Sequence, residues 1–192
     1  QDRTVLASTP ITLTKVEAGV SAPETAPMGS TISVDWTGPD YENDYIGIGK
    51  VGETGGGQWQ NYSYTHDGNP ASLLVPSEPG EYVIRYIAQQ DRSTLSSTTI
   101  NVTEVTAQLV ADSTAQAGTE ITIGWDGPDY VNDYIAIGRV GATGGARWET
   151  YAYTSSGNPV TLTVPEEPGD YLIQYFIQQD RVPLAPLPLT VE

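Results

Sequence analysis

The stretch QDRSTLSSTTINVT, residues 90–103, occurs in closely similar form at two other places in the chain. It reads QDRTVLASTPITLT at residues 1–14 and QDRVPLAPLPLTVE at residues 179–192. The three copies are spaced 89 residues apart, and residues 15–103 align with residues 104–192 without a gap, with about half of the positions identical. A period of this length predicts an array of small domains rather than a solenoid of short units. We therefore expect repeat 1 at residues 15–103, repeat 2 at residues 104–192, and the last strand of a preceding repeat at residues 1–14.

Composition excludes several classes of partner. The 192 residues include 24 acidic and 8 basic side chains, which gives a net charge of −16. Nucleic acid and anionic membrane surfaces are therefore not expected as partners, because both draw their affinity from Lys and Arg. No apolar run approaches the roughly 20 residues of a membrane helix, so we expect no membrane insertion. The chain has no Cys, no initiating Met and no signal peptide, which indicates a processed or excised piece of a longer protein.

Each repeat reads as a series of short strands rich in Ile, Val, Thr and Tyr, separated by turns rich in Gly, Pro and Asn. In GEYVIRYIAQ, residues 80–89, Tyr82, Ile84 and Tyr86 share one face, as in a central strand of packed sheets. Roughly seven such strands with turns every 8 to 12 residues are typical of an immunoglobulin-like sandwich. We predict an all-β fold of tandem immunoglobulin-like β-sandwiches, head to tail, preceded by an orphan strand of the last type (strand G).

The junction between the repeats contains almost no linker, because the last predicted strand of repeat 1 leads directly into the segment EVTAQL that opens repeat 2. We therefore expect stiff coupling. Strand direction places Asp129, Asp133 and Asp180 of repeat 2 against the far end of repeat 1, near residues 52–57 and 77–80. A rod of this kind suits a surface stalk, a spacer or a filament subunit.

The segments GPDYENDYIGIGKVG, NYSYTHDGNP and PGEYVIRYIAQQDRSTL, with their second copies, resemble a known family. They are similar to the Ig-like repeats of secreted or envelope-anchored bacterial proteins that also carry a von Willebrand factor A domain, and a related skeleton occurs in eukaryotic SKICH-type modules. The Asp-x-Ser-x-Ser metal motif of the von Willebrand domain itself does not occur here. The resemblance implies a non-enzymatic module at an extracellular or cell-surface location.

The residue types that both repeats share give little support for a catalytic site. The single His, His66, has Ser155 as its counterpart in repeat 2, and there is no Cys nucleophile, so a nucleophile and its base would have to be built on one loop of one repeat. The carboxylates of Glu166 and Glu167 could serve a glycoside hydrolase, but Ser77 occupies the position of Glu166 in repeat 1, which favours a solvated turn. We predict that the chain is not an enzyme.

Acidic loop residues that both repeats share indicate a hard cation, because Ca²⁺ prefers carboxylate and amide oxygens. The B–C and F–G loops that carry them lie at the same end of an immunoglobulin-like sandwich. The alternative is that these side chains bond their own backbone in turns, with Asp91 paired to Arg92. The candidate ligands for Ca²⁺, the one cofactor that the sequence suggests, are Asp40, Asn43, Asp44, Asp91, Asp129, Asn132, Asp133 and Asp180.

Aromatic residues recur on one strand of each repeat and offer a second interpretation. Exposed aromatic patches mark binding surfaces, and aromatic rings stack on the faces of sugars. The same rings could equally pack inward, since Tyr62 and Tyr64 are two residues apart and share a face. The alternative function is therefore a carbohydrate-binding module of a secreted protein, with a glycan as partner at Trp59, Tyr62, Tyr64, Trp148, Tyr151 and Tyr153.

Residues 1–14 match strand G although both complete repeats already contain one. Unpaired backbone groups together with apolar side chains seek a sheet edge. Either the segment completes a domain outside these two repeats, or it adds to an edge of another subunit. We favour the first, because a slip by one residue would turn the side-chain pattern inside out. The expected partners are neighbouring repeats or other copies of the chain, contacted through Val5, Leu6, Ile11 and Leu13.

Overall fold

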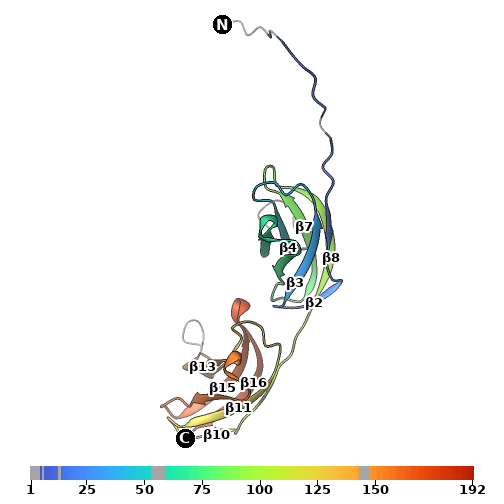
Figure 1. Cartoon of the computed structure of the whole chain (residues 1–192). Coiled ribbons are helices and arrows are strands. Elements are labelled where there is room, and N and C mark those ends of the chain that lie inside the picture. Colours follow the sequence, from blue (N-terminus) through green and yellow to red (C-terminus); the bar gives the residue numbers. More distant parts are fainter. Residues whose placement is uncertain (1–4, 6, 13, 53–58, 143–147) are drawn as a thin grey trace.

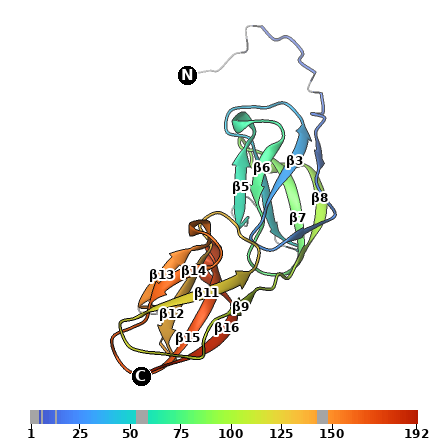
Figure 2. The ribbon, with the colours of Figure 1, turned by 60° about the horizontal axis from the view of Figure 1, so that its bottom comes forward.

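A computed structural model describes residues 5, 7–12, 14–52, 59–142 and 148–192 of the chain. These residues form two β-sandwiches that lie end to end, with an extended N-terminal segment leading away from the first (Figures 1 and 2). Short 3-10 turns occur at Thr65–Asp67, Thr154–Ser156 and Gln179–Arg181. Within the described ranges no helix has the length and apolar character needed to cross a membrane. The predicted all-β class with packed sandwiches is confirmed.

The first sandwich packs a three-stranded sheet against a five-stranded sheet. The smaller sheet has the order β1 (Gly19–Ser21), β3 (Thr31–Thr37), β6 (Ala71–Leu74). The larger sheet has the order β2 (Thr25–Pro27), β8 (Ser93–Thr103), β7 (Gly80–Ala88), β4 (Tyr45–Lys50), β5 (Asn61–Tyr64). Neighbouring strands are antiparallel except β2 and β8, which are parallel.

The second sandwich repeats this topology strand for strand. Its smaller sheet has the order β14 (Val160–Thr163), β11 (Glu120–Asp126), β9 (Gln108–Val110). Its larger sheet has the order β10 (Thr114–Ala115), β16 (Val182–Val191), β15 (Gly169–Ile177), β12 (Tyr134–Arg139), β13 (Thr150–Tyr153). Four residues, 104–107, connect β8 to β9 without strand structure.

The strand that opens each repeat, expected in repeat 2 to begin at EVTAQL (residues 104–109), is divided between the two sheets. β1 pairs with β3, whereas β2, after a break that contains Pro23, pairs with β8 in the opposite sheet. The last strand of repeat 1, which the sequence predicts at STTINVT (residues 97–103), begins four residues earlier, at Ser93. Arg92 has a positive φ of 59°, which turns the chain back at once and places Ser93 opposite Ala88.

The core confirms the predicted central strand. Tyr82, Ile84 and Tyr86 of β7 are fully buried and pack with residues of both sheets. Trp36 of β3 closes the core: its indole N–H donates to a main-chain carbonyl of the β5–β6 connection at 3.1 Å, and the Asn69 side-chain amide donates to the Trp36 carbonyl at 2.8 Å. The second sandwich forms the same contacts around its own tryptophan. The two cores are therefore built on one plan.

The described part of the N-terminal segment belongs to no strand. Val5 and Ile11 are 79% and 83% exposed, and Leu6 and Leu13 lie outside the described residues. Pairing of this segment with a sheet elsewhere stays a prediction.

The 89-residue register shows which of its side chains suit a G strand. Ile11 corresponds to Ile100 and Leu189, which are 2% and 1% exposed in the two cores. Val5 corresponds to Thr94, which is exposed. A G-type pairing would therefore bury Ile11 and leave Val5 facing solvent, which narrows the predicted set of pairing residues.

We predict that this segment pairs with a sheet outside its own two sandwiches, in a neighbouring repeat or in another copy of the chain. Where the sheet belongs to another copy, Ile11→Asp reduces the mass in solution to that of a monomer, because a charge would enter a core. Thr12→Asp is the matched control, since the next residue along the strand corresponds to the exposed Asn101. Multi-angle light scattering measures both, together with a chain lacking residues 1–14. A mass that is monomeric before and after the deletion would contradict self-association.

Candidate functional site

A buried aspartate fixes the loop between β3 and β4, and its counterpart does the same between β11 and β12. Asp44 and Asp133 are 1% and 0% exposed. Oδ2 of Asp133 accepts hydrogen bonds from the Tyr130 N–H at 3.0 Å and the Tyr175 hydroxyl at 2.7 Å, and Oδ1 accepts one from the Gln178 N–H at 3.0 Å. The donors to Asp44 are the equivalent groups of Tyr41, Tyr86 and Gln89. One carboxylate thus ties two loops at the same end of each sandwich.

Burial sets the titration of these groups. Desolvation raises the pKa of Asp133 above its ordinary value, although the hydrogen bonds from Gln178, Tyr175 and Tyr130 oppose the rise. Burial also raises the pKa of Tyr86 to about 12. A carboxyl whose pKa is raised in the folded state makes folding more favourable as the pH falls through that pKa toward the lower value of the unfolded chain. Asp133 therefore acts as an acceptor that organises the loops, and its protonation does not drive acid unfolding.

Backbone geometry explains several of the other shared acidic positions. Asp40 and Asn43 have φ values of 51° and 63°, and Asp129 and Asn132 have values of 54° and 65°. Asp and Asn are among the residues that tolerate this left-handed region best. Asp91 accepts the Ser93 N–H at 3.0 Å, and hydrogen bonds from Ser93 hold the pKa of Asp91 below its usual value.

The predicted calcium ligands are only partly brought together. Asp40, Asn43 and Asp44 share one loop, as do their counterparts in the second sandwich. Among the residues that the structure describes, no group of three or more His, Cys, Asp or Glu side chains is placed to hold a metal ion. Asp44 and Asp133 direct their oxygens at protein donors instead. Calcium binding stays a prediction.

The joint between the sandwiches is formed by the end of β15 and the turn after it. Ile177 is 1% exposed and belongs to the core cluster of the first sandwich. Gly29 has a φ of 75°, and a Cβ on it would lie 2.9 Å from the Ile177 methyl group, so only glycine permits this approach. The Ser77 hydroxyl donates to Asp180 at 2.6 Å. The expected position of Asp180 beside residues 77–80 is confirmed, whereas most of the other expected contact, residues 52–57, lies outside the described residues.

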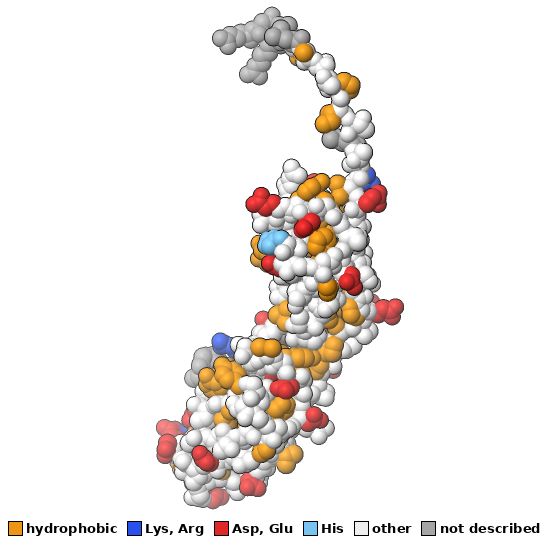
Figure 3. All heavy atoms as spheres, in the orientation of Figure 1, with side chains coloured by type: hydrophobic (Ala, Val, Ile, Leu, Met, Phe, Trp, Pro, Cys, Tyr) orange, Lys and Arg blue, Asp and Glu red, His pale blue; other side chains and the backbone are white. Residues whose placement is uncertain are grey.

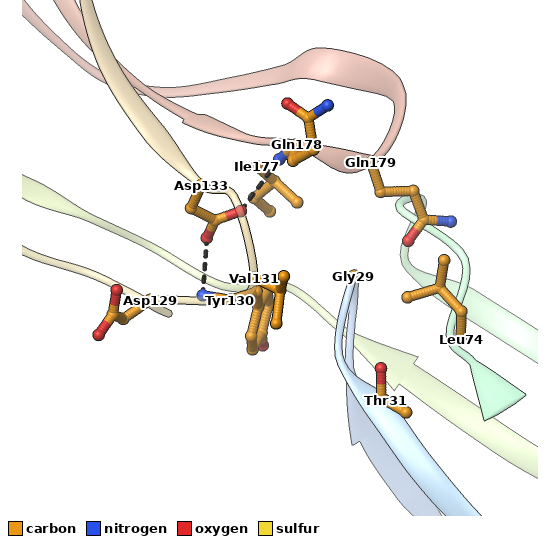
Figure 4. A pocket seen from close by; sticks show the side chains of 10 residues that line it. All are labelled: Gly29, Thr31, Leu74, Asp129, Tyr130, Val131, Asp133, Ile177, Gln178 and Gln179. Carbon is orange, nitrogen blue, oxygen red and sulfur yellow. Dashed lines mark hydrogen bonds between the residues drawn. The ribbon is translucent and has the colours of Figure 1, made fainter. Parts of the chain in front are cut away.

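Two hollows flank this packed contact. One has a volume of about 520 Å³ and is lined by residues of both sandwiches, including Thr31, Leu74, Val131 and Ile177 (Figure 4). The other has a volume of about 450 Å³ and a polar lining of Gln60, Asn61, Ser77, Glu78, Gln179 and Asp180. We call the second one the joint hollow.

The predicted aromatic residues form a small hollow on each sandwich. Aromatic hollow 1, of about 180 Å³, is lined by Tyr45, Trp59, Tyr62, Tyr64, Gln89 and Arg92. Aromatic hollow 2, of about 170 Å³, is lined by Tyr134, Trp148, Tyr151, Tyr153, Gln178 and Arg181. All six positions are identical between the repeats, although only about half of all positions are. Sequence reasoning missed the Tyr of β4, the Gln and the Arg, and their identity in both repeats was the signal that could have found them.

Strand alternation places these rings on the outer face of the larger sheet. Ile46 and Ile48 of β4 enter the core, so Tyr45 and Gly47 face outward. Trp59 lies over Gly47, since a Cβ there would be 3.3 Å from the indole. Tyr62 pairs with Gly47 and is 51% exposed, as is its counterpart Tyr151.

Polar groups complete each aromatic hollow. The Arg181 guanidinium lies 5.8 Å from the centroid of the Trp148 ring, a distance that permits a cation–π contact. The main chain of Gln178 is held by buried Asp133. Burial raises the pKa of Tyr45 to about 12, and the hydrogen bond with Tyr62 raises the pKa of Tyr64. The phenols of Tyr45 and Tyr64 therefore keep their protons at neutral pH and can both donate and accept hydrogen bonds.

Comparison with known proteins gives no family assignment, because neither a protein-family profile nor a curated protein matches the chain. Solved structures that resemble it include the Yersinia pseudotuberculosis adhesin InvE, with 13% identity, a TM-score of 0.36, and coverage of 93% of this chain and 59% of that one. The D0-D1 domain of intimin has 13% identity, a TM-score of 0.27 and coverage of 91% and 98%. The chicken CNTN1 FN1-FN3 domains have 16% identity, a TM-score of 0.30 and coverage of 91% and 65%. Likenesses at this level do not bear on function, and they leave the resemblance to von Willebrand-associated repeats an expectation.

We predict that Asp133→Asn lowers the free energy of unfolding by about 1–3 kcal/mol, because an amide offers one acceptor oxygen where three donors converge and leaves at least one buried donor unsatisfied. Asp129→Asn is the matched control, since Asn tolerates its left-handed backbone, and its effect should stay within about 0.5 kcal/mol. Urea unfolding followed by tryptophan fluorescence measures both. Equal losses in the two variants would contradict the role assigned to Asp133.

Proposed function

We propose that this chain is a stiff, non-enzymatic segment of an extracellular or cell-surface protein with a structural or adhesive role. The proposal treats the two sandwiches as consecutive units of a rod that separates or presents other parts of the parent protein. The resemblance of the repeats to Ig-like repeats of secreted and envelope-anchored proteins supports the location. Calcium would add stiffness at the acidic loops, but the proposal does not depend on it.

The observation that carries the proposal is the packed joint. Domains in one chain move relative to one another by default unless their interface is apolar and well packed. Here Ile177 of the second sandwich is buried in the core cluster of the first, and burial of an Ile side chain is worth about 1.5–3 kcal/mol. The Ser77–Asp180 hydrogen bond and the four-residue connection restrict rotation further.

The joint also differs from the free ends of the two sandwiches, which makes it specific. Ile177 and Ser77 meet at the joint, whereas the equivalent positions at the outer ends are Ala88 and Glu166. A copy of the joint built on Glu166 would set this carboxylate against an aspartate, and like charges at short distance repel. The residues that differ between the two repeats therefore determine which end of one sandwich can pack against which end of the other.

We predict that Ser77→Glu opens the joint, because its carboxylate would face Asp180 in place of a hydroxyl donor 2.6 Å away. Small-angle X-ray scattering should show a broader distribution of distances at low salt, and a return toward the original curve in about 1 M salt, where repulsion between the two carboxylates is screened. The reciprocal exchange Glu166→Ser at the outer end is the matched control and should leave the curve unchanged. A Ser77→Glu chain that scatters like the original would contradict the stiff rod.

Carbohydrate binding is the second candidate function, and the aromatic hollows favour it. Six lining residues are identical in both hollows, and Tyr62 and Tyr151 expose half of their surface. Exposed aromatic rings bordered by a few polar groups are common in ligand sites. An adhesive rod could use such hollows to hold a glycan.

We predict that the chain binds on a glycan array and that the double variant Tyr62→Ala, Tyr151→Ala loses the signal, because each hollow then lacks an exposed ring. Tyr41→Ala is the matched control, since Tyr41 is 54% exposed and lies outside the hollows. Circular dichroism of all variants checks that the fold is retained. Absence of binding to every glycan on the array would reject carbohydrate binding and leave the structural role.

A further inference from the structure

Three hollows follow one another across the joint. Trp59 and Tyr62 line aromatic hollow 1, and the residues between them include Gln60 and Asn61, which line the joint hollow. Gln178 and Arg181 line aromatic hollow 2, and the two residues between them, Gln179 and Asp180, line the joint hollow from the other side. The residues that line the joint hollow are thus chain neighbours of residues that line each of the two aromatic hollows.

The strands that carry the aromatic hollows lie on the same side of the molecule. Figure 2 draws β5 and β13 along one flank, and Figure 1 draws β4 and β13 along the same flank from another direction. β8 spans 11 residues, so one sandwich is roughly 35–40 Å long at about 3.4 Å per residue. A ligand that reaches both aromatic hollows must therefore be a chain, since a disaccharide is far too short.

Two side chains that line the joint hollow have polar atoms without hydrogen-bond partners. Asn61 Nδ2, a donor, and Gln179 Oε1, an acceptor, are both buried and have no hydrogen-bond partner among the described residues. Burying an amide group without a partner costs free energy. Each side chain must turn toward the hollow before a ligand can reach it. A hydroxyl group, which both donates and accepts, would then satisfy either atom.

We propose that the three hollows form one track that binds a single neutral polysaccharide chain, with sugar rings in both aromatic hollows and a hydroxyl-rich stretch across the joint. This inference rests on the carbohydrate-binding candidate and adds the length and charge of the ligand. It also gives the packed joint a purpose in binding, because the joint keeps the two aromatic hollows at a fixed separation.

Charge argues for a neutral chain. The protein carries a net charge of −16, and acidic side chains are scattered over the visible faces of both sandwiches, with few basic ones (Figure 3). A polyanion would be repelled over distances of several ångströms. The joint hollow itself contains Glu78 and Asp180. A neutral sugar chain avoids this repulsion and still accepts hydrogen bonds from Arg and Gln at the rims.

Affinity electrophoresis provides the first measurement. The gels contain mixed-linkage β-glucan, galactomannan or amylopectin as neutral chains, and polygalacturonate or alginate as anionic chains. We expect retention by a neutral polymer with little dependence on salt. Retention by anionic polymers alone would overturn the neutral ligand, and failure of all five would overturn carbohydrate binding as well.

Calorimetric titration of single variants then tests whether one chain occupies both aromatic hollows. Linking two sites multiplies affinity by about 10²–10⁴, so the polymer should bind about 100-fold more tightly than its own disaccharide. Tyr62→Ala or Tyr151→Ala alone should each remove about 100-fold of the polymer affinity. Losses of no more than about two-fold would mean separate sites, which would overturn the track while leaving carbohydrate binding intact.

Gln179→Ala tests the joint hollow directly. We expect it to weaken polymer binding about ten-fold, as the loss of one well-made polar contact does, without changing binding of the disaccharide. Gln90→Ala is the matched control, because Gln90 is the same residue at the equivalent position of the first sandwich, where it is exposed and lies at the outer end. Equal effects of the two variants, or none from Gln179→Ala, would overturn the participation of the joint.

Discussion

The buried carboxylate of Asp133, with Asp44 as its counterpart, is the constraint on which the rest of the structure depends. It joins the loop before β12 to the end of β15 through three hydrogen bonds. Ile177, at the end of β15, and Asp180, in the turn after it, form the joint. The Gln178 main chain that it holds also borders aromatic hollow 2. A single desolvated acid therefore positions both the mechanical contact and the candidate binding surface.

The two repeats share one fold, and the positions that are identical between them have different roles from the positions that differ. Positions that build the core, the buried carboxylate and the aromatic hollows are largely shared, as for Tyr86 and Tyr175. At the joint, Ser77 and Ile177 differ from their counterparts Glu166 and Ala88, whereas Gly29 and Asp180 are shared with theirs. Shared residues preserve a fold and a surface, whereas differing residues decide which ends fit together. Duplication inside one chain thus separates the residues needed in every unit from those needed at one contact.

Much of the fold could be predicted because its signals are local and repeated. The period-2 pattern of residues 80–89 predicted β7 as a central strand, and the direction of strand G predicted that Asp180 lies beside residues 77–80. The division of the first strand between sheets was missed, because Pro23 marks a break without saying where the chain goes next. The role of Asp44 was missed for a similar reason: an acid in a loop has the same sequence pattern whether it binds a cation, a solvent molecule, or one donor of its own loop and two donors from a distant part of the chain. Only the packing of Tyr86 and Gln89 around it distinguishes these cases.

The stiffness of the joint and the use of the aromatic hollows are parts of one physical argument. A flexible joint would let the two hollows vary in separation, and the gain from holding one ligand at two places falls as that separation varies. Each hollow alone is small, about 170–180 Å³, well below the 300–1,000 Å³ typical of sites that enclose a whole ligand. Useful affinity for a chain must therefore come from linking the hollows, and the linkage is only as good as the contact between Ile177, Gly29 and their neighbours. Ile177, Gly29 and their neighbours hold the two sandwiches together, and the same contact would hold the two weak aromatic sites at a fixed separation for one ligand.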